Sequence, residues 1–185
     1  MDLKVSILSE PPISGSIKEY WFDAKGDCTW IQFERASETW AGVFGKGALK
    51  NYNAICKFSD DKYVFIIAGG QGYILDSRAH KLCHKTSIDY FVSAIAIPYK
   101  DLMIVCDFTS LYAFDTQELI WRSDRIALDG IKLDSSTENE LSGKVWQVDG
   151  WYSFQLEYKN WKYTQGSRLP KIGSNILNEH SRQNR

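Results

Sequence analysis

Proline is scarce in this sequence, at four of 185 residues, and no apolar run approaches the roughly 20 residues needed to span a bilayer. Neither sign of charge is in excess, because 22 basic residues balance 23 acidic ones. A nearly neutral chain lacks the excess of basic residues that is typical of proteins that bind nucleic acid or an anionic membrane. We therefore expect neither as a partner.

Cysteine is limited to Cys28, Cys56, Cys83 and Cys106, and no two of them have the CxxC spacing of a redox or metal motif. Each lies in or beside an apolar run typical of a strand, where a cysteine acts as a small buried hydrophobe. Residues 1–16 do not have the pattern of a secretory signal. These features predict a cytoplasmic protein without a disulfide framework.

The chain is rich in aromatic side chains, which make up 14% of it, with seven Trp and ten Tyr. Such side chains suit pleated, half-buried surfaces, so the composition predicts an all-β fold. No long segment has helical periodicity, and we expect at most one short helix around residues 14–24, capped by Ser14 or Ser16. We expect one all-β domain over residues 1–170 and a flexible tail over residues 171–185.

Two segments of the chain repeat each other at an offset of 39 residues, without a gap. The match lies in the pattern of apolar and turn-forming residues, and the identical pairs are Tyr73 with Tyr112 and Asp76 with Asp115. Each segment is predicted to form four short strands, over residues 54–58, 63–68, 72–76 and 81–84 in the first and residues 92–97, 102–106, 110–114 and 118–122 in the second.

Four short strands that recur about every 40 residues have the period of a β-propeller blade. Over residues 54–122 the chain therefore resembles β-propeller-type blade repeats. The Gly-His and Trp-Asp pairs of tryptophan–aspartate repeats are absent, so the resemblance implies a fold and transfers no functional residue. Residues 28–45 and 130–158 add flanking strands to the two repeats, 54–84 and 93–122. We expect repeated four-stranded antiparallel sheets in a partial or small propeller-like arrangement, either open or closed.

The segment FIIAGGQGYILD, residues 65–76, raises the question of a phosphate-binding loop, because Gly69, Gly70 and Gly72 follow an apolar strand. Such a loop needs its glycines to open a helix, whereas the residues after Gly72 are strand-like. The equivalent positions of the second repeat, FTSL, hold no glycine. The pattern predicts a hairpin turn in which glycine provides a positive φ or room for a passing backbone.

His80, Cys83 and His84 form the cluster that most resembles a metal site. Adjacent residues of a strand point to opposite faces, so Cys83 and His84 would not converge on one ion. The third histidine, His180, lies in the tail. We expect no metal and no cofactor, and we interpret these histidines as solvent-facing residues.

Carboxylates are the remaining candidates for catalysis, since a glycosidase needs two of them about 5–10 Å apart. Because Asp76 and Asp115 occupy equivalent positions of the repeats, hydrogen bonds from each side chain to its own turn are the simpler interpretation. The candidates lie in turns or near strand ends: Asp60, Asp61, Asp76, Asp89, Asp107 and Asp115.

Aromatic residues near the C-terminal turns are candidates for binding. Exposed Trp and Tyr are enriched at protein interfaces, and beside lysines they can stack on single-stranded nucleic acid. The balanced charge disfavours nucleic acid, and the alternative role is to fill the core between sheets. The residues concerned are Trp151, Tyr152, Trp161 and Tyr163, interleaved with Lys159 and Lys162.

Because no catalytic constellation is present, we expect a protein-binding module and not an enzyme. Our leading hypothesis is a bacterial immunity protein that neutralises a cognate toxin by occluding it, which requires affinity and no chemistry. Two alternatives stay open. One is a small-ligand or carbohydrate-processing protein that uses carboxylates at the mouth of the sheets, and the other is a subunit of a larger assembly completed by a partner or a second copy. The sequence does not identify the partner-binding residues.

Overall fold

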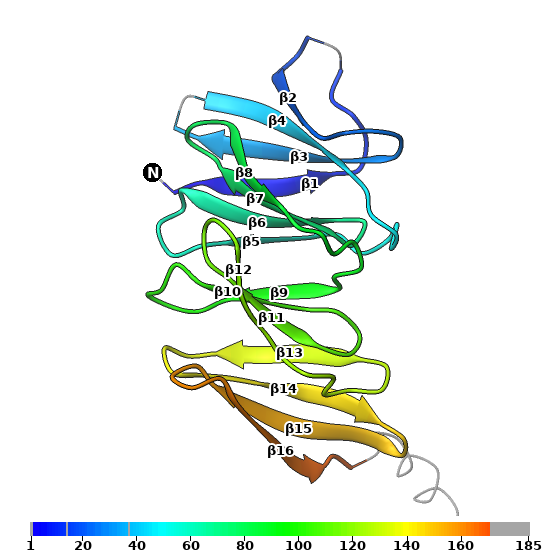
Figure 1. The fold of residues 1–185 in the computed structure, drawn as a ribbon. Coiled ribbons are helices and arrows are strands. Elements are labelled where there is room, and N and C mark those ends of the chain that lie inside the picture. Colours follow the sequence, from blue (N-terminus) through cyan, green and yellow to red (C-terminus); the bar gives the residue numbers. More distant parts are fainter. Residues whose placement is uncertain (1, 14, 37, 171–185) are drawn as a thin grey trace, which may run out of the picture.

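The computed structural model describes residues 2–13, 15–36 and 38–170, and this part of the chain forms sixteen β-strands and no helix. The strands make four four-stranded sheets, which follow one another along the sequence and stack from one end of the molecule to the other (Figure 1). The prediction of an all-β fold built from repeated four-stranded sheets is confirmed. The tail over residues 171–185 lies outside the described residues. Within the described ranges, no helix is long and apolar enough to cross a membrane.

The second and third sheets are the two repeats found in the sequence. Their strands agree with the expected ones to within one residue at every boundary, and each sheet is antiparallel with its strands in sequence order. The strands are β5 (Ala54–Lys57), β6 (Tyr63–Ala68), β7 (Gln71–Asp76) and β8 (Lys81–Lys85) in the second sheet, and β9 (Ser93–Ala96), β10 (Met103–Cys106), β11 (Leu111–Phe114) and β12 (Leu119–Arg122) in the third.

The fourth sheet has the same antiparallel sequence order and contains one strand, β16, that the sequence pattern does not predict. The reason is that β16 has mostly exposed polar residues and so has no apolar alternation. The strands are β13 (Ile131–Ser136), β14 (Glu140–Gln147), β15 (Gly150–Glu157) and β16 (Lys162–Arg168).

The first sheet differs in its connections, with the order β1-β3-β4-β2. The helix expected around residues 14–24 is wrong, because Lys18–Phe22 is a strand, β2, that pairs with β4. Alternate side chains of β2 point to opposite faces, and Phe22 stacks on Phe44 in the core. The pairing of β2 with β4 is parallel, so the first sheet is mixed, whereas the other three sheets are antiparallel as expected. The other strands are β1 (Lys4–Leu8), β3 (Cys28–Arg35) and β4 (Glu38–Gly45).

Three hydrophobic cores hold the stack together, one between each pair of consecutive sheets. The core between the first two sheets contains the stacked rings of Phe33 and Trp40, 3.9 Å apart, and Tyr73. Phe91 lies in the core between the second and third sheets, and Phe154 in the core between the third and fourth. Among the described residues, no buried cluster joins the fourth sheet to the first.

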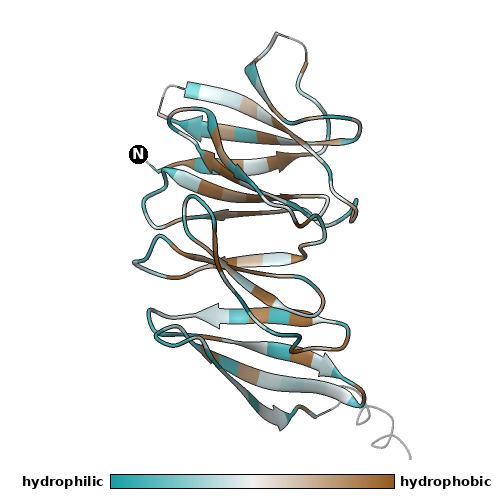
Figure 2. Ribbon diagram, in the orientation of Figure 1, coloured by the Kyte–Doolittle hydropathy of each residue, from teal (hydrophilic) through white to brown (hydrophobic). Residues whose placement is uncertain are grey.

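The two middle sheets are covered on both faces and the two end sheets on one. In the middle sheets nearly every residue of β6, β7, β10 and β11 is buried, as expected for apolar runs with neighbours on both sides. In the end sheets burial alternates along β3 and β14, and Figure 2 shows the alternation of hydropathy along β13. The strands β1, β5, β9 and β13 lie side by side in this order, and we call this row the inner edge.

Candidate functional site

The glycine-rich segment forms a two-residue hairpin turn between β6 and β7, as predicted. Gly69 and Gly70 have φ values of 55° and 88°, in the region that favours glycine. The N–H of Gly69 donates to Asn53 Oδ1, and the N–H of Gly70 donates to the carbonyl of Tyr52. The donors that a phosphate loop would offer to its ligand are therefore used by neighbouring segments of the same chain. The turn has a structural role.

The His80, Cys83 and His84 cluster does not assemble. The His80 ring stacks on Tyr20 with centroids 4.4 Å apart, and its Nε2 lies 3.1 Å from Glu38 Oε1. Cys83 is exposed in β8, which begins one residue after His80. No group of three potential metal ligands comes together among the residues that the structure places. His180 is outside the described ranges.

Asp76 and Asp115 cap equivalent turns, in agreement with the interpretation from the repeat. Asp76 Oδ1 accepts hydrogen bonds of 3.0 Å from the N–H groups of Arg78 and Ala79. Asp115 Oδ1 accepts hydrogen bonds of 2.7 and 2.8 Å from Gln117 and Glu118. Each carboxylate thus accepts hydrogen bonds from backbone N–H groups that have no strand partner where the chain leaves the sheet.

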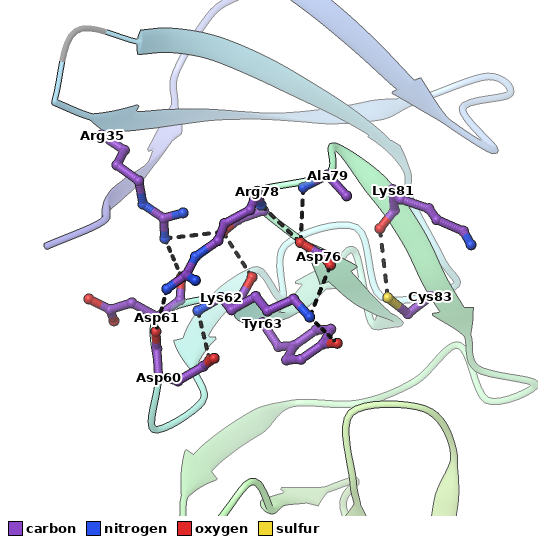
Figure 3. A network of polar contacts seen from close by, with 11 residues as sticks. Arg35, Asp60, Asp61, Lys62, Tyr63, Asp76, Arg78, Ala79, Lys81 and Cys83 are labelled. Atoms are coloured by element: carbon purple, nitrogen blue, oxygen red, sulfur yellow. Dashed lines mark hydrogen bonds and ion pairs between the residues drawn. The ribbon is translucent and has the colours of Figure 1, made fainter.

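Asp60 and Asp61 belong to a network of paired charges between the first and second sheets (Figure 3). Asp60 Oδ1 accepts from the N–H of Lys62, and Asp61 forms a 2.7 Å ion pair with Lys57. Arg35 donates to the backbone carbonyl of Asp61. These two carboxylates thus have hydrogen-bonding or ionic partners within the chain. A depression of about 460 Å³ is lined by Asp60, Asp61, Arg35, Arg78, Glu38 and Asp2.

The remaining carboxylates lie apart from this network. Asp107 is buried in the turn between β10 and β11, where it accepts from the N–H groups of Thr109 and Ser110 and from the hydroxyl of Tyr112. Asp89 lies in the linker between β8 and β9, where its carbonyl accepts from the N–H of Ala48. The candidate carboxylates are thus spread over several turns.

The C-terminal aromatic residues divide between core and surface. Tyr152, Trp161 and Tyr163 pack against the core between the third and fourth sheets. Trp151 belongs to none of the three core clusters and instead contacts Trp146 and the ammonium group of Lys132. Lys162 begins β16, and Lys159 lies in the turn before it. Of the two roles considered for these rings, packing against the core therefore applies to the three other than Trp151.

The outer edge of the third sheet is a candidate interface that the sequence does not reveal. Strand β12 ends the sheet, and its residues Leu119 and Ile120 are 39% and 45% exposed. Proteins usually protect such edges with charged side chains, above all lysine. The other outer strands follow this rule, with Lys18 in β2, Lys81 and Lys85 in β8, and Lys162 in β16, whereas β12 has no lysine. The outer edge of the third sheet is thus the one without lysine, and its single charged residue is Arg122.

A groove of about 590 Å³ runs beside β12, between it and the fourth sheet. Its floor contains the stacked rings of Trp121 and Trp161, with centroids 4.7 Å apart. Tyr163 lines the same groove, and its buried hydroxyl has no hydrogen-bond partner within the part of the chain that the structure describes. Arg122 and Arg125 also line the groove, with Asp124 as its carboxylate. An open strand edge beside an aromatic groove suits an extended peptide segment.

Solved structures resemble the chain, among them the following two. A chain of Kuenenia stuttgartiensis hydrazine synthase superposes with a TM-score of 0.53 at 7% identity, over 85% of this chain and 52% of that chain. A chain in the S. cerevisiae complex of Dbp5 with Nup159, Gle1, IP6 and ADP gives a TM-score of 0.46 at 13% identity, over 66% of this chain and 35% of that chain. The chain thus spans about half of the former and about a third of the latter.

At 7% identity the likeness to the hydrazine synthase chain concerns the fold alone. No protein-family model matches the sequence, and no curated protein matches it.

Proposed function

We propose that this chain is a non-enzymatic protein-binding module, built from four propeller-type blades, whose partner adds an extended segment to the edge of β12. The observation that carries the proposal is the contrast between the four outer strands. Three of them carry lysine, and β12 instead presents Leu119 and Ile120 next to the Trp121–Trp161 groove. A partner strand placed there gains backbone hydrogen bonds from the edge and selectivity from the groove.

The groove specifies the chemistry of the partner segment. Its stacked tryptophans favour an apolar or aromatic side chain, and its two arginines outnumber its single aspartate. We therefore propose an extended segment that carries both apolar and acidic residues on its groove-facing side, the apolar ones against the tryptophans and the acidic ones near the arginines.

The narrower role that we propose is that of a bacterial immunity protein, which would neutralise a toxin by occluding it. A rigid stack of sheets with an exposed docking edge supports this role, because occlusion requires a stable complex and no reaction. The alternative of a carbohydrate-processing enzyme has less support, because Asp60, Asp61, Asp76, Asp107 and Asp115 are engaged in turn bonds or ion pairs.

The proposal is tested with the protein encoded by the neighbouring gene, co-expressed and co-purified with this chain. Ile120→Lys places a lysine in the β12 edge, and we expect the affinity to fall about tenfold or more. Val148→Lys is the matched control, since Val148 is 86% exposed and lies outside the groove. Hydrogen exchange of β12 should slow on binding in the parent protein.

Equal binding by the two lysine variants, with unchanged melting temperatures, would exclude the β12 edge as the interface. If the neighbouring protein is toxic, cells that express the Ile120→Lys variant should lose protection while Val148→Lys cells keep it. Turnover of a sugar substrate that is abolished by Asp→Asn changes would contradict the non-enzymatic proposal.

A further inference from the structure

A cavity of about 600 Å³ lies between segments that belong to different sheets and linkers. Its walls come from the linker 46–53, from residues 92–93 at the start of β9, from the turn between β10 and β11, from residues 129–134 and from β15. The cavity and the β12 groove share no lining residue. Small-ligand sites typically have volumes of about 300–1,000 Å³, so this cavity is large enough to be a separate site.

Three aromatic rings line the cavity. Tyr52 and Phe108 meet edge to face, with centroids 5.7 Å apart and planes at 86°, so they form two walls that are nearly perpendicular. Trp151 lines the cavity from the fourth sheet. Gly130 connects it to Phe108, because the N–H of Gly130 donates a 2.7 Å hydrogen bond to the Phe108 carbonyl and a Cβ at Gly130 would lie 3.2 Å from the Trp151 ring. The rings thus share one cavity although they come from three parts of the chain.

One of these rings already accepts a cation from the chain itself. The ammonium group of Lys132 lies over the Trp151 ring, 4.6 Å from its centroid. The face of an aromatic ring attracts a positive charge, and tryptophan does so most strongly. Within the described ranges Lys132 forms no ion pair with a carboxylate. The Trp151 ring is therefore accessible to a positively charged group and placed to bind one.

The cavity also has a carboxylate that the rest of the chain does not neutralise. Asp129 and Asp134 both line it. Asp134 forms a 3.3 Å ion pair with Lys144. No side-chain hydrogen bond or ion pair of Asp129 occurs in the part of the chain that the structure describes. Asp129 can therefore attract a cation that comes from solution.

The remaining lining indicates which kind of cation fits. Val92, Ile131 and Leu133 line the cavity together with the rings, and such side chains accept no strong hydrogen bond. A primary ammonium group has three N–H donors that each need an acceptor, whereas a quaternary ammonium group has none. Recognition of quaternary ammonium groups by several aromatic rings is an established use of cation–π attraction.

We propose that this cavity binds a small molecule with a quaternary ammonium group. The cation lies against the rings of Tyr52, Phe108 and Trp151, and the carboxylate of Asp129 complements its charge. This site is independent of the β12 edge, since no residue lines both. Ile120→Lys should therefore leave the binding of the cation unchanged, so that the two proposals can fail separately.

Choline chloride is the probe, and its binding to the full-length chain is measured by calorimetry and by tryptophan fluorescence. The neutral alcohol in which a tert-butyl group replaces the trimethylammonium group has the same shape without the charge. We expect choline to bind at least about fivefold more tightly than this alcohol, because only the cation gains from the rings and from Asp129. Equal affinities, or no binding of choline at millimolar concentrations, would overturn the proposal.

Tyr52→Ala removes one wall of the cavity, and Tyr90→Ala is its matched control. Both tyrosines are 41% exposed and lie in linkers between sheets, but Tyr90 does not line the cavity. Tyr52→Ala should weaken choline binding about threefold or more, and Tyr90→Ala should not. Equal affinities of these two variants, with melting temperatures like that of the parent, would contradict the site.

Two charge variants test the sign of the ligand. Asp129→Asn should weaken choline binding, whereas Asp124→Asn, which changes a carboxylate in the β12 groove, should not. Lys132→Met should strengthen choline binding, because it removes a like charge from the lining and frees the face of Trp151. Unchanged or weaker binding by Lys132→Met would contradict a cationic ligand in this cavity.

Discussion

The hydroxyl of Tyr112 donates a 2.7 Å hydrogen bond to Oδ2 of Asp107, a carboxylate buried at the turn between β10 and β11. Burial of the ring, together with the bond to this carboxylate, raises the pKa of Tyr112 above its ordinary range. Tyr73, 39 residues earlier, is equally buried, but its hydroxyl donates to the neutral carbonyl of Gly45 at 2.7 Å. The two repeats thus share the buried tyrosine but differ in the hydrogen-bond acceptor of its hydroxyl.

This difference predicts unequal costs for the same substitution. Tyr112→Phe should lower the free energy of unfolding by about 1.5–3 kcal/mol, because it removes a hydrogen bond to a buried charged group. Tyr73→Phe should cost about 0.5–1.5 kcal/mol, because its acceptor is neutral. Urea unfolding of the two variants measures both values, and equal costs would show that the charge on Asp107 does not strengthen its bond.

Gly70 is the position where the fold depends most directly on glycine. Its φ of 88° disfavours any side chain, and a Cβ there would lie 2.5 Å from the carbonyl oxygen of Asp89 in the linker that crosses the turn. Gly70→Ala should therefore destabilise the protein by about 3 kcal/mol or more, from left-handed backbone strain plus overpacking.

Gly26 provides the control for this substitution. It has a similar φ of 71°, but nothing lies within 4 Å of a Cβ built at this position. Gly26→Ala should cost only the backbone strain, about 1–2 kcal/mol. If thermal unfolding shows the same loss for both variants, the crossing linker does not restrict the Gly69–Gly70 turn.

The sequence predicts the middle of this molecule well because its strands have neighbours on both faces. The apolar runs of β6 and β10 and the turn residues between them repeat at one period, so pattern and structure agree there. At the ends the pattern weakens. Strand β2 was missed because its pairing with β4 depends on a crossing connection, which no local periodicity records. Strand β16 was missed because few of its side chains are buried.

The candidate interface could not be predicted, for a related reason. The residues of β12 were expected to form a strand, but the openness of its edge is a property of the order of strands in the sheet. The same holds for the tryptophan pair on the outer side of the first sheet, since Trp21 and Trp30 are separated in sequence by residues 23–27 and meet only across Val43. The carboxylates were more predictable, because a turn bond from Asp76 or Asp115 involves residues two and three positions away.

The turn bond of Asp76 makes the stability of the fold depend on pH. Partial burial disfavours its charge, but the N–H groups of Ala79 and Arg78 and the ammonium group of Lys62, 3.5 Å away, outweigh this and lower its pKa. A carboxyl with a lower pKa in the folded state than in the unfolded state stabilises the fold when ionised. This contribution is fully present above the unfolded pKa of about 4 and is lost as the pH falls through the folded-state pKa.

Asp76→Asn keeps the shape and one acceptor oxygen but removes the charge, so it tests this dependence. At about pH 7 the variant should be less stable than the parent by a few tenths to about 1 kcal/mol, the range for partly exposed charge pairs. Below about pH 3 the difference should shrink, because the parent carboxyl is then increasingly protonated. Urea unfolding of both proteins across this pH range measures the difference. A difference that stays constant with pH would mean that ionisation of Asp76 does not contribute to folding.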